Sequence, residues 1–212
     1  YNPATAKIYT DMSYLTSKDE ITNDMTRFFH FLTGFSKKGK LNELYMSPSQ
    51  IKSKVLSLIQ NETRKGSKGE IIAKVNSLVD EDVIRALYKA SQAGVKVDLI
   101  VRGICCLKPG IEGVSENIRV ISILGKYLEH SRTFYFKNDE SGVYISSADW
   151  MPRNLMRRIE LLTAVNDEKS KDKIIQILKL QCADNSLAHE LHKDGSYTKI
   201  KDEGIKSINN HK

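Results

Sequence analysis

Apolar residues recur along the chain at two spacings, one typical of strands and one typical of helices. Strict alternation over residues 95–101 predicts a strand, and the apolar run at residues 70–76 predicts another. Between them, Asp80 is placed to cap a helix that ends at Gly94. This strand, helix, strand order predicts two parallel strands joined by a crossover helix, as in α/β folds.

More strands are expected in the second half of the chain. The polar segment 138–142 contains a glycine and lies between two of them, which indicates a hairpin turn. The expected strands cover residues 119–123, 133–136, 143–146 and 159–164.

Three further amphipathic helices complete the pattern. The first is expected to start at a capping box formed by Ser17 and Glu20 and to stop at Gly34. The second starts at residues 47–50 (SPSQ), another capping box with proline at the first helical position. The last helix is capped by Asp167.

The basic loop at residues 36–40 (SKKGK) marks an expected domain boundary. It divides the chain into residues 1–40 and residues 41–212. Beyond Asp184 the sequence is polar and weakly periodic, so we expect a peripheral or partly loose tail there.

The charge balance favours anionic partners. The 212 residues include 33 Lys and Arg against 26 Asp and Glu, a formal net charge of +7. Nucleic acid, acidic lipid heads, nucleotides and phosphate polymers would all be attracted. There is no apolar run of about 18 residues, which removes the simplest evidence for membrane insertion. The three cysteines form neither a disulfide framework nor a metal pattern, and we expect a reducing, cytoplasmic location.

Candidate chemistry gathers where the predicted strands end. Arg102 directly follows the strand at residues 95–101 and precedes Gly103, so a guanidinium there can reach a phosphate beside unobstructed backbone. Ligands of open α/β sheets bind at this carboxyl edge. The alternative for Arg102 is a salt bridge to Asp98 or a contact with a helix end.

His130 and Arg132 stand two residues apart, so in an extended segment they face the same side. Histidine can carry or donate a proton or a phosphoryl group, and arginine neutralises phosphate oxygens, which suits phosphoryl transfer. A histidine that is merely packed or hydrogen-bonded is the alternative. Ser147, Arg153 and Asn154 follow the next strand exit as candidate phosphate contacts, or alternatively as a cap and a solvated basic turn.

Several signatures are missing from the sequence. It contains no G-x-x-x-x-G-K-[ST] loop and no G-x-G-x-x-G after a strand, so any use of a nucleotide proceeds without these phosphate-binding loops. His189 and His192 lie three residues apart with no cysteine nearby. We therefore assign no metal ligand in this chain.

Five long motifs follow one another in the chain, at residues 5–11 (TAKIYTD), 97–105 (VDLIVRGIC), 113–119 (GVSENIR), 127–132 (YLEHSR) and 146–154 (SSADWMPRN). In this order they closely resemble the C-terminal region of bacterial polyphosphate kinase. The resemblance runs from residue 1 to about residue 180.

The resemblance implies a fold similar to the phospholipase D superfamily. Residues 41–212 would form an α/β domain with a mixed sheet flanked by helices, and residues 1–40 would be the end of the upstream catalytic half. The implied activity is the reversible transfer of the terminal phosphate of ATP to a growing inorganic polyphosphate chain, through a phosphohistidine and with magnesium. The implied partners are ATP, ADP and polyphosphate, with no nucleic acid. Homo-oligomers are expected of the full-length enzyme, and peripheral membrane association stays an option.

The resemblance also assigns roles to single residues. Tyr9 matches the family's nucleotide-contacting tyrosine, Arg102 its phosphate-binding arginine, and His130 its second-half histidine, which binds phosphate and serves as general acid. Arg132 stands where the wider superfamily has lysine. The nucleophilic histidine and the magnesium-associated arginines match positions upstream of Tyr1, so we expect the fragment alone to be inactive.

Two other functions stay open. A phosphodiesterase or nuclease of the phospholipase D superfamily would also use His130, Arg132 and Ser147, and it would release product from a phosphodiester without ATP. A polyanion-binding module without enzymatic activity would fit the net charge of +7. Nucleic acid binding that polyphosphate fails to compete away would favour the module.

Overall fold

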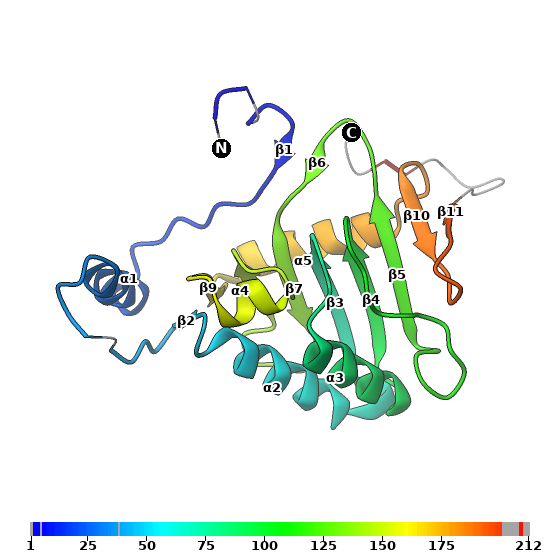
Figure 1. Cartoon of the computed structure of the whole chain (residues 1–212), viewed down its shortest axis with the longest axis horizontal. Helices are drawn as coiled ribbons and strands as arrows, with labels where there is room; N and C mark the ends of the chain where they lie inside the picture. The colour runs from blue at the N-terminus through cyan, green and yellow to red at the C-terminus, as the bar shows by residue number, and fades with distance from the viewer. Residues whose placement is uncertain (1, 5, 38, 201–207, 210–212) are drawn as a thin grey trace.

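The fold is built around a long mixed sheet. The computed structural model describes all residues except 1, 5, 38, 201–207 and 210–212. Within the described residues, nine strands form one sheet in the order β11-β10-β5-β4-β3-β7-β8-β9-β2, and β1 and β6 form a separate small pair (Figure 1). The strands are β1 (Tyr9–Thr10), β2 (Leu44–Met46), β3 (Glu70–Val75), β4 (Lys96–Val101), β5 (Ile118–Ile123), β6 (Leu128–Glu129), β7 (Arg132–Phe136), β8 (Val143–Ser146), β9 (Leu161–Ala164), β10 (Ala188–Leu191) and β11 (Tyr197–Lys199).

Helices pack on both sides of this sheet (Figure 1). Along β3, Ile71, Ala73 and Val75 belong to the apolar cluster that contains the buried residues of α2 and α3. Ile72, which points to the opposite face, belongs to the cluster with α5. The expected α/β fold with a mixed sheet flanked by helices is confirmed. The helices are α1 (Asp19–Leu32), α2 (Ile51–Thr63), the short 3-10 helix η1 (Gly66–Lys68), α3 (Glu81–Gln92), α4 (Pro152–Met156) and α5 (Glu168–Cys182).

The parallel pair at the centre of the sheet forms as the sequence predicts. β3 and β4 are parallel neighbours, with Val75 beside Val101 at their carboxyl ends. The Asp80 carboxylate accepts a hydrogen bond of 3.2 Å from the backbone N–H of Val83 and so caps α3. Gly94 ends the helical segment with a φ of 89°, a conformation that suits glycine.

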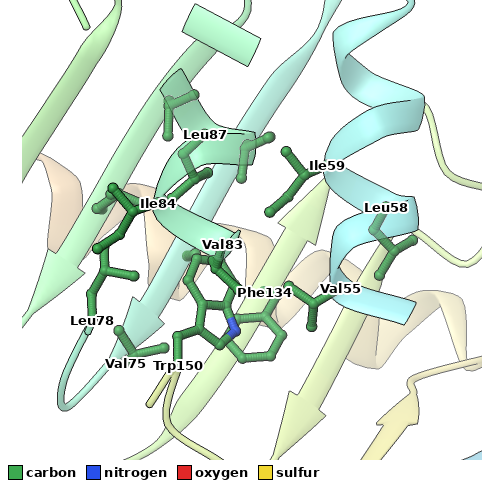
Figure 2. Close-up of a cluster of buried hydrophobic side chains, with 14 of the residues drawn as sticks. Val55, Leu58, Ile59, Val75, Leu78, Val83, Ile84, Leu87, Phe134 and Trp150 are labelled. Atoms are coloured by element: carbon green, nitrogen blue, oxygen red, sulfur yellow. The ribbon is translucent and has the colours of Figure 1, made fainter. Parts of the chain in front are cut away.

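An aromatic pair fills the core below the carboxyl ends of these strands. The rings of Phe134 and Trp150 lie 5.0 Å apart between centroids, and both side chains are fully buried next to Val83 (Figure 2). The Trp150 carbonyl accepts backbone hydrogen bonds of 2.9 Å from both Val79 and Asp80. These contacts fix the segment after β8 against the segment that leads into α3, and Trp150 is a core residue.

A buried carboxylate attaches α1 to the edge of the sheet. Asp24 on α1 is fully buried, and its Oδ2 accepts backbone hydrogen bonds from Asn42, Glu43 and Leu44 at 2.7, 2.7 and 3.1 Å. An apolar cluster that contains Ile21 lies beside this contact. The segment that starts β2 is therefore held directly by a side chain of α1.

Two predicted helix starts are wrong. The expected capping box at Ser17 does not form, because α1 begins at Asp19 after Lys18 without a side-chain cap. The second helix begins at Ile51 rather than at residue 48. The residue before the helix is Gln50, no side chain caps the helix, and the Ser47 hydroxyl donates a 2.5 Å hydrogen bond to the carbonyl of Asn154.

The prediction of a peripheral tail after Asp184 is wrong for residues 188–191. This segment forms β10 and pairs antiparallel with β5, and Ala188 is fully buried. The tail prediction for residues 201–207 and 210–212 lies outside the described residues. In the part of the chain that the structure describes, no helix is both long and apolar enough to cross a membrane.

Replacing Trp150 by alanine tests the aromatic core. We expect the free energy of unfolding to fall by about 3–5 kcal/mol, because the change removes a fully buried ring and leaves a cavity. Denaturant unfolding measures this loss. Leu180→Ala is the control, since Leu180 is 47% exposed and its truncation should cost less than about 1 kcal/mol. Equal effects of the two substitutions would contradict the described packing.

Candidate functional site

One large cavity opens where several strands end. Its volume is about 1030 Å³, and its lining includes residues that follow β3, β4 and β8 and residues that precede β7. The wall contributed by residues 12–15 and α1 is largely apolar. The polar part of the lining, the polar wall, contains the predicted residues Arg102, His130, Arg132, Ser147, Arg153 and Asn154.

A buried carboxylate organises the polar wall. Asp149 is 5% exposed, and its two oxygens accept hydrogen bonds from Nε and Nη2 of Arg132 at 3.2 and 2.9 Å. Its Oδ1 also accepts from the backbone N–H of Asn76 at 2.7 Å. A bidentate contact of this kind fixes the plane of a guanidinium. Asp149 thus holds Arg132 and joins the ends of β3, β7 and β8.

His130 is held from two sides. Its Nδ1 lies 2.8 Å from Oδ2 of Asp11, and its Nε2 lies 3.1 Å from Nη1 of Arg132. A carboxylate only accepts and a guanidinium only donates. The same Nη1 also lies 3.3 Å from Nδ1, so the guanidinium stands against both ring nitrogens, and the contact with Asp11 requires a proton on Nδ1. His130 and Arg132 share one side of the chain, as predicted.

The strand before His130 is paired with the first residues of the chain. β1 and β6 are parallel, and the backbone N–H of His130 donates to the carbonyl of Thr10 at 3.0 Å. This pairing brings Tyr9 and Asp11 to the histidine. The Tyr9 ring stands edge-on to the imidazole, 5.0 Å away between centroids, outside the lining of the cavity.

Arg102 is directed to the cavity by Asn76. Its Nε donates to the Asn76 side-chain carbonyl at 3.1 Å, and the Asn76 side-chain amide donates to the backbone carbonyl of His130 at 3.4 Å. The alternative salt bridge from Arg102 to Asp98 is wrong, because Asp98 pairs with Arg119 at 2.8 Å and with Lys96.

Gly103 allows the two strand ends to approach this closely. Its backbone N–H donates to the carbonyl of Asn76 at 2.7 Å, and an added Cβ would lie 2.9 Å from that same oxygen. A side chain at position 103 would therefore force apart the segment that carries Arg102 and the segment that carries Asn76.

Ser147 and Asn154 reach the cavity but are bound to Glu160. The Ser147 hydroxyl donates to Oε2 of Glu160 at 2.6 Å, and the Asn154 amide donates to Oε1 at 2.7 Å. Asn154 is 3% exposed, and among the described residues its side-chain oxygen has no hydrogen-bond partner. These two residues therefore shape the cavity around Glu160, which accepts from the Ser147 hydroxyl and from the Asn154 amide.

Arg158 joins the cavity although it was not among the predicted site residues. It lines the cavity together with Arg102 and Arg153. No described residue forms a hydrogen bond or ion pair with the terminal Nη atoms of these three arginines. The sequence signal for Arg158 was its place five residues after Arg153, at the end of a short basic turn. The sequence carried no signal for Asp11, whose partner His130 is 119 positions away.

Two family models match the chain and cover nearly all of it. "Polyphosphate kinase C-terminal domain 1" matches residues 1–38, and "Polyphosphate kinase C-terminal domain 2" matches residues 44–211. The chain belongs to the polyphosphate kinase family. The predicted resemblance is confirmed.

Relatives in this family agree over almost the whole chain. A polyphosphate kinase of Campylobacter jejuni is 62% identical over 200 residues, which are 94% of this chain and 29% of the relative. A polyphosphate kinase of Helicobacter pylori is 53% identical over 201 residues, 94% of this chain and 30% of the relative. The chain thus spans less than a third of the length of these curated polyphosphate kinases.

Solved structures show the same fold. The crystal structure of polyphosphate kinase from Porphyromonas gingivalis matches with a TM-score of 0.93 and 37% identity, over 99% of this chain and 33% of that chain. Nuc from Salmonella typhimurium, a phospholipase D family member, matches with a TM-score of 0.52 and 16% identity, over 71% of this chain and 97% of that chain. The phospholipase D-like fold of this polyphosphate kinase region is confirmed.

Replacing Asp149 by alanine tests the organisation of the polar wall. We expect the free energy of unfolding to fall by about 3–5 kcal/mol, because the mostly buried guanidinium of Arg132 loses its counter-charge. Denaturant unfolding measures the loss. The matched control is Glu81→Ala, which breaks an exposed pair with Arg85 and should cost less than about 1 kcal/mol. A loss from Asp149→Ala no larger than that of the control would show that the pair does not organise this wall.

Proposed function

We propose that this chain supplies the C-terminal half of a polyphosphate kinase active site. The enzyme would transfer the terminal phosphate of ATP reversibly to a growing inorganic polyphosphate chain. The transfer passes through a phosphohistidine whose nucleophilic histidine lies outside residues 1–212. The observation that carries the proposal is that His130 and Arg102 line one cavity and are linked through Asn76.

The charges of the polar wall suit a chain of phosphoryl groups. Arg102, Arg132, Arg153 and Arg158 all line the cavity. Each charge-assisted hydrogen bond to a phosphate oxygen contributes about 1.5–3 kcal/mol, so a few such contacts hold a polyanion firmly. Phosphoryl transfer depends mainly on positioning and on neutralising the oxygens of the moving group. The terminal Nη atoms of Arg102, Arg153 and Arg158 would neutralise these oxygens.

His130 would act as general acid in the transfer. Asp11 accepts from Nδ1, so proton exchange with a substrate oxygen falls to Nε2. In the imidazolium form, with Nδ1–H still donated to Asp11, the proton on Nε2 would pass to the leaving oxygen as the phosphorus–oxygen bond breaks, and His130 would return to the neutral imidazole. Arg132, held rigid by Asp149, keeps the imidazole oriented and neutralises the phosphate beside it. Tyr9, whose ring contacts His130 from outside the cavity lining, would contact the nucleotide, as the family resemblance implies.

The described residues do not fit a magnesium site held by the protein alone. No group of three or more His, Cys, Asp or Glu side chains among them could hold a metal ion. Three acidic side chains at the cavity, Asp11, Asp149 and Glu160, accept hydrogen bonds from protein groups. We therefore derive no step through magnesium, whose ligands we expect outside this chain. The homo-oligomer, peripheral membrane association and cytoplasmic location also stay predictions.

Replacing His130 by alanine in the full-length enzyme tests the proposal. We expect ATP-dependent polyphosphate synthesis to slow by about 100-fold or more, because the general acid is lost. The matched control is His189→Ala on β10, whose imidazole bonds the Leu187 carbonyl and should be dispensable.

Two outcomes would contradict the assignment. Turnover of His130→Ala within a few-fold of wild type would remove the proposed role of the histidine. Release of product from a phosphodiester without ATP, together with no polyphosphate synthesis by the wild-type enzyme, would favour the phosphodiesterase alternative.

A further inference from the structure

A buried lysine lies directly behind the strand segment that carries His130. Lys74 on β3 is 4% exposed, and its ammonium contacts Oε2 of Glu129 at 2.5 Å and Oγ of Ser131 at 2.6 Å. Gln181 on α5 donates to the same Glu129 oxygen at 3.1 Å. Glu129 is itself 4% exposed, so the ion pair is shielded from solvent on both sides.

Lys74 thus binds both sequence neighbours of His130. In an extended segment alternate side chains point to opposite sides, so the side chains of Glu129 and Ser131 point away from that of His130. The Lys74 ammonium holds residues 129 and 131, and so it fixes this segment on the side opposite to the imidazole. The imidazole between them is then turned toward the cavity that it lines.

The sheet itself does not supply this anchor. In the β3–β7 ladder the last pair is Lys74 with Thr133, so His130 lies beyond the paired part of the main sheet. The strand before it, β6, pairs with the two-residue β1. Asn76, two residues after Lys74 and on the same face of β3, adds a 3.4 Å hydrogen bond to the His130 carbonyl.

A lysine at this position is costly to the fold. Ile72, two residues earlier on the same face, packs in the apolar cluster with α5. Burial lowers the pKa of Lys74 below its ordinary value, and the nearby Glu129 carboxylate opposes this shift. Buried ion pairs are often no more stabilising than apolar side chains of similar size. The stability of the core therefore does not explain why an ammonium stands here, whereas its two contacts beside His130 do.

We propose that Lys74 is a positioning residue that holds the imidazole of His130 in its reactive orientation through Glu129 and Ser131. The inference rests on the proposed function of His130 and adds a residue that does not line the cavity. A purely structural lysine would affect the amount of folded enzyme. A positioning lysine affects the rate of each folded molecule.

The double variant Lys74→Met/Glu129→Gln tests this in the full-length enzyme. It removes both charges together, so neither is left buried alone. We expect kcat per folded enzyme to fall by about 10- to 100-fold, because small misplacements of a reacting group cost rate on this scale. The KM for ATP should change less than about threefold, because the cavity arginines remain in place. Circular dichroism and the thermal midpoint establish the folded fraction.

Lys52→Met is the matched control. Lys52 forms ion pairs with Asp80 and Asp82 at the start of α3, away from the cavity lining. Its kcat should stay within about twofold of wild type, because neither Lys52 nor its two partners line the cavity. If the double variant does not fold, Ser131→Ala tests the role of Lys74 instead, because it removes one of the two Lys74 contacts without unpairing a charge. We expect it to lower kcat several-fold with little change in KM.

A folded double variant with wild-type kcat would overturn the role of Lys74. If the double variant does not fold, a wild-type kcat of Ser131→Ala would overturn it. His130→Ala in the same assay separates the two proposals. If His130→Ala abolishes synthesis while the Lys74 variants are unaffected, only the positioning inference fails. If His130→Ala keeps wild-type turnover, the proposed function of the histidine fails first.

Discussion

The buried carboxylate of Asp149 is the constraint on which the polar wall depends. It accepts two hydrogen bonds from Arg132 and one from the backbone of Asn76, so one side chain joins the ends of β3, β7 and β8. Arg132 in turn contacts the imidazole of His130, and Asn76 contacts both His130 and Arg102. Without this carboxylate, the mostly buried guanidinium of Arg132 would lose its counter-charge, and the backbone of Asn76 would lose its link to Arg132.

The same arrangement concentrates part of a modest net positive charge at one cavity. A surplus of seven positive charges spread over the surface would attract any polyanion. Here four arginines line one cavity and Asp149 holds one of them in a bidentate contact, while the terminal nitrogens of the other three have no hydrogen-bond partner among the described residues. The carboxylates of Asp11 and Asp149 set the orientation of His130 and Arg132 and leave the charge of the wall positive. Positioned charge of this kind is what phosphoryl transfer requires.

Local sequence patterns predicted the elements at the centre of the fold. The elements that they missed depend on contacts between residues far apart in the sequence. The β3, α3 and β4 unit followed from alternation, the Asp80 cap and Gly94, all of which act within a few residues. The start of α2 was predicted too early, because residues 47–50 match a capping box in sequence but the helix begins at Ile51 without a side-chain cap. The strand β10 was missed because its polar sequence gains its partner, β5, only in the folded sheet.

For the site, the strand-end rule predicted Arg102, and the spacing in the sequence predicted that His130 and Arg132 face the same side. Asp11 reaches His130 only through the β1–β6 pairing, which no local pattern encodes.

We expect His130 and Arg102 to bind the same chain of phosphoryl groups. A crystal structure of the full-length enzyme with inorganic tripolyphosphate tests it most directly. We expect phosphoryl oxygens of one bound molecule within hydrogen-bond distance of both the His130 imidazole and the Arg102 guanidinium. Tripolyphosphate bound elsewhere, with this cavity left to solvent at saturating ligand, would contradict it.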